Sequence, residues 1–128
     1  MAKHILIVDD EQDIRAVVRI SLEKFAGWRT SLAATAQEAL EKARSQLPDA
    51  ILLDITMPDT DGFQVWDQLQ SDPLTKSIPV ILLTAKTSSL DKKRFSNMGV
   101  AGVISKPFNP LIIWKQVREI LAWDNSSQ

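Results

Sequence analysis

The stretch LLDITMPDTDG, residues 52–62, places an aspartate directly behind a run of apolar residues. The run begins at Ala50, and its Ile and Leu content predicts a buried strand over residues 50–53. Asp54 follows at the end of that strand, where burying a charge without a partner is costly. Partners for this carboxylate must therefore come from elsewhere in the chain.

Four more apolar runs recur along the chain, over residues 5–8, 30–34, 80–83 and 103–104. Segments whose apolar residues are spaced three and four apart separate them, which is typical of helices. The predicted helices cover residues 13–25, 36–43, 63–69 and 90–98, and a fifth runs from Pro110 to about Trp123. Thr35 and Glu38 resemble a capping box for the second helix, and Asn109 is expected to cap the fifth.

This alternation of strands and helices predicts the fold class. Parallel strands need a crossover, and a right-handed crossover lays its helix on the sheet. The runs at residues 5–8, 50–53 and 80–83 are continuously apolar, which indicates burial on both faces. We therefore predict an α/β fold, (βα)5, with a doubly wound five-stranded parallel sheet.

Composition narrows the class of protein. The 128 residues, 45% of them hydrophobic, suffice for one domain with a core. The absence of cysteine excludes disulfides, thiol nucleophiles and cysteine metal sites. No apolar run is long enough for a signal peptide or a bilayer span, so we expect a cytoplasmic protein without membrane contact. The net charge of -1 and the short basic run at residues 92–94 predict no direct nucleic-acid binding.

Other polar side chains follow predicted strands in the same way as Asp54. Asp9 and Asp10 follow the first apolar run, Thr84 follows the fourth and Lys106 comes just after the fifth. The carboxyl ends of parallel strands share one edge of the sheet, where ligands bind in open α/β folds. We expect these side chains to converge there.

The chemistry of this set is specific. Three ionised carboxylates need a compensating cation, and oxygen ligands of high charge suit Mg²⁺ better than zinc or copper. A carboxylate held beside Mg²⁺ and an ammonium can attack phosphorus as a nucleophile. The product would be an aspartyl phosphate at Asp54, its charge shared by the metal, Lys106 and the Thr84 hydroxyl.

The segments ILIVDDE, LLDITMPDTDG, ILLTA and SKPF, in this order, resemble the receiver domains of two-component response regulators. The likeness covers essentially the whole chain and is strongest to stand-alone receivers such as the chemotaxis regulator. It implies a flavodoxin-like fold with strand order 2-1-3-4-5. It also implies a receiver domain over residues 1–124, with a polar C-terminal tail over residues 125–128.

The resemblance implies roles for individual residues. Asp54 would accept a phosphoryl group from a histidine kinase or histidine phosphotransfer protein. Asp10 would bind Mg²⁺ (or Mn²⁺) directly and Asp9 mainly through water, with Asp54 and the backbone carbonyl of Thr56 completing the protein ligands.

It further implies that Thr84 is the switch hydroxyl and that Lys106, followed by Pro107 in a cis peptide, supplies the ammonium. The loop after the phosphoacceptor would contain Met57, Pro58 and Gly62. Gly62 would relieve the backbone there. The protein would catalyse only its own phosphorylation and dephosphorylation, and would not be an enzyme acting on a metabolite.

One position departs from the family pattern. Receivers usually carry Tyr or Phe three residues before the lysine, and here that residue is Val103. An aromatic rotamer switch is therefore unavailable. Phosphorylation would have to act by shifting the backbone and the helix over residues 90–98. Otherwise the signal would have to reach a partner through another surface. The face formed by the last two helices and the last strand is also where a homodimer or a downstream protein of unknown identity could bind.

Other interpretations remain open for single residues. Asp9 and Asp10 alone could be acids interacting with the dipole of the first helix, and Asp54 alone could be a turn residue. Their joint placement with Thr84 and Lys106 favours a site. The apolar run over residues 111–114 covers more than one helix face, and its exposed members are either scattered or form a docking patch.

Three other functions compete with a phosphoryl relay. The first is a receiver-fold interaction module that works independently of phosphorylation. The second, an aspartyl-nucleophile phosphohydrolase, would need a second acid where Thr56 stands. The third, flavin binding, would need a phosphate-cradling loop where the sequence has Asp9, Asp10 and Glu11.

Overall fold

The structure, a computed structural model of the 128-residue chain, describes residues 2–55, 62–85 and 89–123. Three expected loop or ligand residues, Thr56, Met57 and Pro58, lie outside the described residues, as does the tail over residues 125–128.

Five parallel strands form one sheet in the order β2-β1-β3-β4-β5, which confirms the predicted fold class and strand order. The strands are β1 (His4–Val8), β2 (Arg29–Ala33), β3 (Ala50–Asp54), β4 (Val80–Thr84) and β5 (Gly102–Ser105). The helices are α1 (Gln12–Ala26), α2 (Ala36–Gln46), α3 (Gly62–Ser71), α4 (Ser89–Met98) and α5 (Ile113–Leu121).

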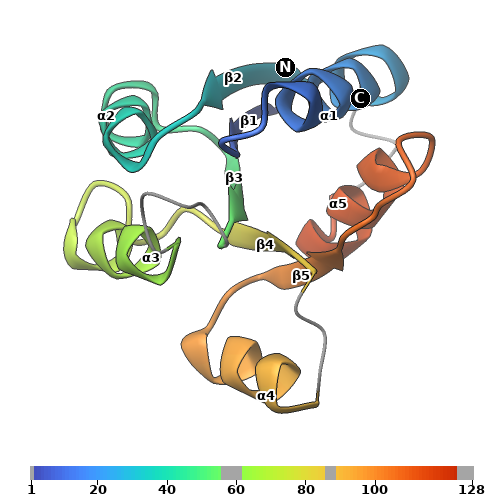
Figure 1. Ribbon diagram of the computed structural model, residues 1–128. Helices are drawn as coiled ribbons and strands as arrows, with labels where there is room; N and C mark the ends of the chain where they lie inside the picture. The colour runs from blue at the N-terminus through green and yellow to red at the C-terminus, as the bar shows by residue number, and fades with distance from the viewer. Residues whose placement is uncertain (1, 56–61, 86–88, 124–128) are drawn as a thin grey trace.

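Helices cover both faces of the sheet (Figure 1). Side chains alternate between faces along each strand, so Leu6 and Val8 pack toward α2, α3 and α4, while Ile5 and Ile7 pack toward α1 and α5. Every residue of β3 and β4 is buried, because these strands have neighbours on both sides and helices above and below. The continuous apolar runs in the sequence reflect this burial. Among the described residues, no helix has the length and apolar character needed to cross a bilayer.

The predicted capping box at the start of α2 forms, with one difference. The Thr35 side chain accepts a hydrogen bond from the Glu38 amide at 3.1 Å. The Glu38 carboxylate accepts in return from the amide of Ala34 at 3.2 Å, one residue before the cap. Both bonds satisfy amides near the helix start that have no partner within the helix.

The predicted start of the last helix is wrong by three residues. Asn109 accepts a hydrogen bond on its side chain from the Leu111 amide at 2.9 Å, and its carbonyl accepts from Ile112 and Ile113 at 3.0 Å. These bonds close a separate turn before α5 begins at Ile113. Asparagine favours such turns because its side chain competes for nearby backbone amides.

The apolar run over residues 111–114 is divided between core and surface. Ile113 is fully buried, whereas Leu111 and Ile112 are 64% and 41% exposed. Trp114 is half-buried, and its indole nitrogen donates to the Leu111 carbonyl at 3.0 Å. The exposed pair lies on the turn that precedes α5, not on the helix itself.

Gly62, the first residue of α3, touches the end of β3. A Cβ atom on Gly62 would lie 2.4 Å from the Ile55 Cα and 2.9 Å from the Asp54 carbonyl oxygen. The glycine is therefore required by a close approach of two backbones. Its φ lies outside the left-handed region, unlike that of Gly99 at +85°.

Candidate functional site

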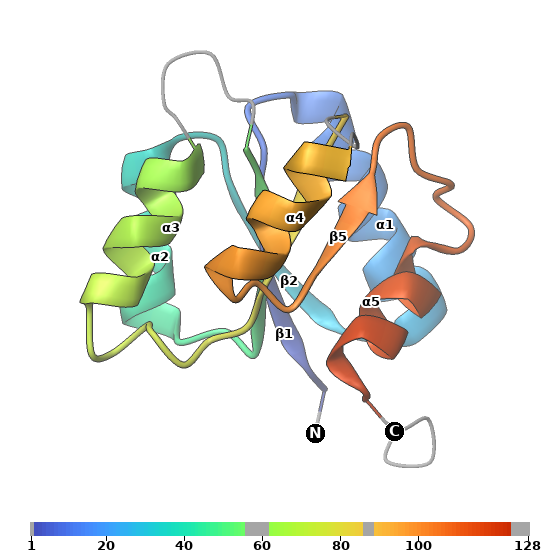
Figure 2. The same ribbon diagram turned by 90° about the horizontal axis from the view of Figure 1, so that it is seen from below.

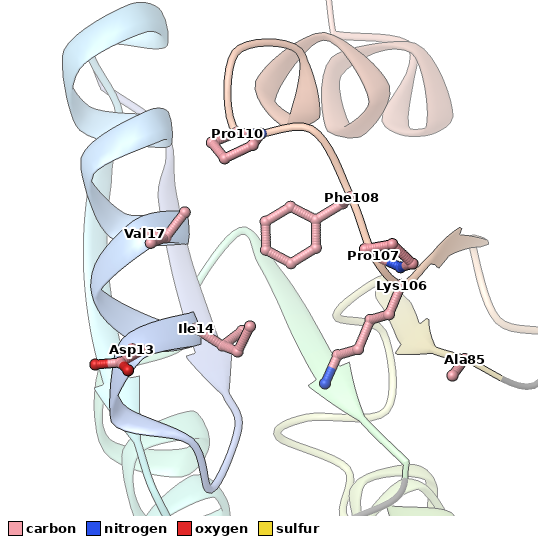
Figure 3. Close-up of a pocket in the computed structure, with 8 residues that line it drawn as sticks. All are labelled: Asp13, Ile14, Val17, Ala85, Lys106, Pro107, Phe108 and Pro110. Carbon is pink, nitrogen blue, oxygen red and sulfur yellow. The ribbon is translucent and has the colours of Figure 1, made fainter.

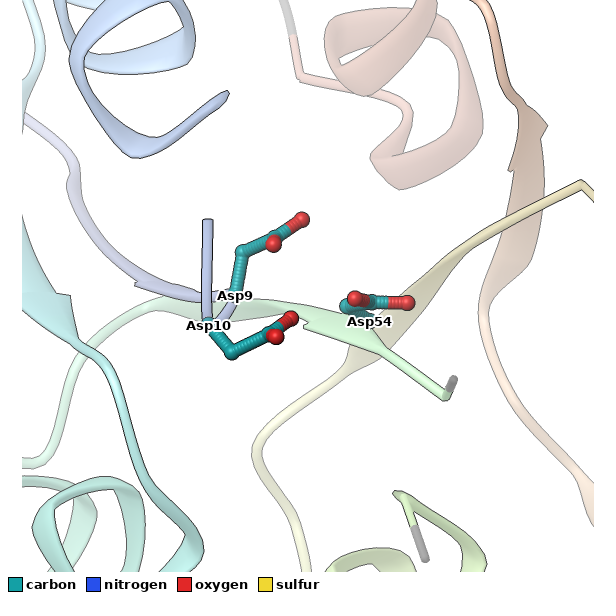
Figure 4. A group of neighbouring side chains, drawn as sticks. All are labelled: Asp9, Asp10 and Asp54. Atoms are coloured by element: carbon teal, nitrogen blue, oxygen red, sulfur yellow. The ribbon is translucent and has the colours of Figure 1, made fainter. Parts of the chain in front are cut away.

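Three carboxylates meet at the carboxyl edge of the sheet. Asp9 follows β1 directly, Asp10 comes next, and Asp54 is the last residue of β3, which lies beside β1. Figure 4 shows the three side chains together at this edge. One ligand oxygen from each lies within 4.8 Å of the others, and the structure has no second cluster of this kind among its described residues. The predicted convergence of Asp9, Asp10 and Asp54 is present.

Lys106 reaches the same point from the end of β5. Its ammonium lies 3.0 Å from Asp9 Oδ2 and 3.4 Å from Asp54 Oδ2. The base of the side chain is held because the Lys106 amide donates to the Thr84 carbonyl at 2.8 Å. The peptide between Lys106 and Pro107 is cis, as the family resemblance implied.

Burial and charge set the protonation of this cluster. The pKa of Asp9 is raised above its ordinary value, mainly by burial and also by the charge of Asp54. Hydrogen bonds from the Glu11 amide and from Lys106 lower it, but they do not outweigh burial. Burial lowers the pKa of Lys106, but the hydrogen bond and charge of Asp9, together with Asp54, outweigh burial and raise it overall. Lys106 is therefore charged at neutral pH, and its ammonium pairs with the carboxylates of Asp9 and Asp54.

The carboxylate set fits a hard divalent cation. All three side chains offer oxygen atoms, and among the described residues the Lys106 ammonium forms ion pairs with two of them, Asp9 and Asp54. Asp9 and Asp54 are buried, whereas Asp10 is exposed. A metal held here would keep a solvent-facing side, which suits Mg²⁺ because it retains several waters. The residues present therefore fit Mg²⁺.

Thr84 ends β4, the strand between β3 and β5, and is fully buried. Asp54 pairs in register with Leu83, and Thr84 with Ser105, so Thr84 lies one step beyond Asp54 at the same edge. Val103 is half-buried on β5 and packs against the core beneath α2, α3 and α4.

Arg15 also contributes to the site and was not predicted from the sequence. Its guanidinium donates from Nη1 to the backbone carbonyl of Asp9 at 2.7 Å. That carbonyl belongs to the peptide between Asp9 and Asp10, so the bond restrains both acids. Asp9 Oδ1 also accepts from the Glu11 amide at 2.9 Å. The available signal was an arginine in the first helix, six residues after Asp9, but such a residue also occurs on solvated faces.

An apolar pocket lies beside the cluster, between α1 and the connection from β5 to α5. Its volume is about 420 Å³. Figure 3 shows Phe108 facing Ile14 and Val17 across it. The rest of the lining is Asp13, Ala85, Lys106, Pro107 and Pro110. A hydrogen bond from the Ser21 hydroxyl to the Pro110 carbonyl, 2.6 Å long, joins the two walls.

The chain is similar to response regulators over most of its length. The family model described as the response regulator receiver domain matches residues 5–118. The alkaline phosphatase synthesis transcriptional regulatory protein PhoP of Bacillus subtilis is 37% identical over 121 residues, covering 94% of this chain and 49% of that protein. Response regulator Rre1 of Synechocystis is 36% identical over 123 residues, covering 96% of this chain and 53% of that protein. The chain thus spans about half the length of these relatives.

Solved structures resemble the fold over nearly the whole chain. The chemotaxis response regulator CheY4 of Vibrio cholerae superposes with a TM-score of 0.85 at 32% identity, covering 94% of this chain and 99% of that one. A CheY-like receiver domain protein of Methanospirillum hungatei gives a TM-score of 0.82 at 29% identity, covering 100% of both chains.

Proposed function

Because the chain belongs to the response regulator receiver domain family of two-component systems, we propose that Asp54 accepts a phosphoryl group in a Mg²⁺-dependent reaction. The observation that carries this proposal is the position of Asp54. It is buried at the end of β3, grouped with Asp9 and Asp10 within 4.8 Å and 3.4 Å from the Lys106 ammonium.

Asp9, Asp10 and Asp54 would hold the metal, with the backbone carbonyl of Thr56 as a further ligand outside the described residues. Bound Mg²⁺ would neutralise negative charge on the phosphoryl oxygens and on the carboxylates. Arg15 would keep the peptide between Asp9 and Asp10 in place through its bond to the Asp9 carbonyl. Asp10, the exposed acid, would face the side from which the donor approaches.

The reaction needs one nucleophile and fixed positive charge. A carboxylate oxygen of Asp54 would attack phosphorus as the bond from phosphorus to the donor breaks, giving an aspartyl phosphate and the free donor. The Lys106 ammonium, already within 3.4 Å of Asp54, would stabilise the negative charge of the transferred group. The Thr84 hydroxyl at the end of the next strand would donate to a phosphoryl oxygen. Lys106 and Thr84 would thus stabilise the negative charge of the phosphoryl group on Asp54.

The proposed partners follow from the family to which the chain belongs. We propose a histidine kinase or histidine phosphotransfer protein as the donor, and output by protein contact or onward phosphotransfer. The protein would act on no metabolite and would catalyse only its own phosphorylation and dephosphorylation. We also propose a cytoplasmic location, a receiver domain over residues 1–124 with a tail over residues 125–128, and a homodimer through the face of α4, β5 and α5 as one mode of output.

Intact mass spectrometry after incubation with acetyl phosphate tests the proposal. The wild type should gain the mass of one phosphoryl group when Mg²⁺ is present and none when EDTA removes the metal. Asp54→Asn should gain nothing in either case, with an unchanged fold by circular dichroism. A wild type that binds Mg²⁺ but never gains this mass would contradict the proposal and favour an interaction module that works without phosphorylation.

A further inference from the structure

A chain of close contacts connects the backbone of Asp54 with the surface helix α4. Its first link is Gly62, whose Cα approaches the Asp54 carbonyl and Ile55 so closely that an added Cβ would lie 2.9 Å from the carbonyl oxygen. No side chain separates the start of α3 from the end of β3 at this point. Because packed backbones have no free space to absorb a shift, a displacement of one moves the other.

The second link is Phe63, the residue after Gly62. Its ring stacks on that of Phe95 in α4, with centroids 6.2 Å apart and planes inclined by 25°. The guanidinium of Arg94 lies over the same ring, with Cζ 3.8 Å from the centroid. A cation over a ring face is attracted by the quadrupole of the ring, and guanidinium also stacks well on aromatic faces. The start of α3 is therefore held to two successive residues of α4.

The third observation concerns α4 itself, which lies beside α3 on the same face of the sheet (Figure 2). Phe95 is the one buried residue among residues 90–98. Leu90 is 81% exposed, more than any other large hydrophobic side chain in the described part of the chain. A helix with so little buried apolar surface belongs to the less stable parts of a fold. Among the described residues, the contacts that position α4 include the burial of Phe95 and those of Phe63 with Arg94 and Phe95.

We propose that Phe63 and Arg94 are positioning residues that couple the state of Asp54 to the position of α4. This inference rests on the proposed function, since it concerns what phosphorylation of Asp54 does to the fold. A phosphoryl group adds charge and volume at the end of β3. The backbone at Ile55 adjusts, the first turn of α3 moves with it through Gly62, and Phe63 transmits the shift to Arg94. Coupling of this kind is reciprocal, so a partner bound to α4 alters the phosphoryl reaction at Asp54.

Hydrogen exchange of the α4 amides, read by mass spectrometry on the 128-residue protein, tests the coupling. The phosphoryl mimic is beryllium trifluoride, added in the presence of Mg²⁺. In the wild type the mimic should change exchange over residues 90–98. In Arg94→Met this change should shrink by about threefold, the size expected for loss of one exposed cation–π contact, and in Phe63→Leu by at least as much, because the stacking on Phe95 is lost as well. The double variant should shrink it no further than Phe63→Leu does, because Phe63→Leu already removes the contact with Arg94. Phe63→Trp keeps a ring and should restore the response.

Lys93→Met is the matched control, since Lys93 is the exposed neighbour of Arg94 and its loss removes the same charge from the same helix. It should keep the full wild-type response. An undiminished response in Arg94→Met, or an equal loss in Lys93→Met, would overturn the coupling. Arg94 is exposed, so its variant tests the proposal even if Phe63→Leu fails to fold.

Phosphorylation by acetyl phosphate distinguishes failure of this inference from failure of the proposed function. If the wild type gains no phosphoryl mass, the proposed function fails and the coupling fails with it. If the wild type and Arg94→Met both gain the mass and α4 responds equally in both, the coupling alone fails.

Discussion

The ammonium of Lys106 lies 3.0 Å from the carboxylate of Asp9, although 97 positions separate the two residues. Asp9 follows β1 and Lys106 follows β5, so the pair bridges the two strands that lie between them, β3 and β4. The Asp9 side chain is fully buried and that of Lys106 is 16% exposed. This contact and the ion pair of Lys106 with Asp54 therefore join the ends of β1, β3 and β5, and the ammonium compensates the charge of the two carboxylates.

Replacing Lys106 by Met should destabilise the metal-free protein. The substitution leaves two buried carboxylates without their ammonium, and we expect the free energy of unfolding to fall by about 2 kcal/mol, less than for a fully enclosed pair. Urea unfolding in EDTA measures this loss. Mg²⁺ should recover part of it, because the cation replaces the missing positive charge. Lys115→Met, at an exposed position of α5, serves as the control and should have little effect. A Lys106→Met protein as stable as the wild type in EDTA would contradict the electrostatic role of the pair.

The stability of the metal-free protein should depend on pH through Asp9. Its pKa is raised by burial above the ordinary value of 3.8, so the folded state binds this proton more tightly than the unfolded state. The stabilisation is fully present below the unfolded pKa and is lost as the pH rises through the folded pKa. In EDTA, Asp9→Asn should therefore lose less stability than the wild type as the pH is raised from 3.8 toward neutrality. Urea unfolding of both proteins across that window measures the difference, and parallel curves would be inconsistent with a raised pKa.

Arg15 should matter for metal affinity more than for folding. Its bond to the Asp9 carbonyl orients the peptide that carries both Asp9 and Asp10. Groups that orient metal ligands typically change affinity by tenfold or more, so Arg15→Met should raise the Kd for Mg²⁺ about tenfold in titration calorimetry. Arg15→Lys keeps the charge and separates its contribution from that of the planar guanidinium.

Arg19→Met, one turn further along α1 at an exposed position, is the matched control for Arg15. It should leave the Mg²⁺ affinity unchanged. Equal losses in Arg15→Met and Arg19→Met would point to a general disturbance of α1, not to positioning of the acids, because removing a positive charge by itself favours cation binding.

Replacement by alanine should destabilise the protein more at Gly62 than at Gly99. Gly62→Ala places a Cβ atom 2.4 Å from the Ile55 Cα, a backbone atom that cannot rotate away, and should cost about 3 kcal/mol of stability. Gly99→Ala meets nothing within 4 Å, but its φ of +85° is strained for an L side chain and should cost about 1 kcal/mol. Thermal and urea unfolding of the two variants compare these costs. A larger loss at Gly99 than at Gly62 would refute the close approach as the reason for Gly62.

The local pattern of the chain was enough to predict the fold class and the five strands. Buried parallel strands must be apolar without alternation, and helices on both faces leave a visible spacing of apolar residues. Boundaries were less predictable at the last helix, because Asn109 can cap either a helix or a separate turn, and the choice depends on bonds that span only a few residues. The exposure of Leu111 and Ile112 follows from that turn.

The sequence by itself determined that Asp9, Asp10, Asp54, Thr84 and Lys106 would gather at one edge, because parallel strands bring their carboxyl ends together whatever lies between them in the chain. Only the tertiary structure decided which further side chains reach that edge and what leads away from it. The bond from Arg15 to Asp9, the approach of Gly62 to Asp54 and the stacking of Arg94 on Phe63 depend on how helices are seated on the sheet. Such contacts between elements leave no periodic trace in the chain, since they are set by packing in three dimensions and not by spacing along the sequence.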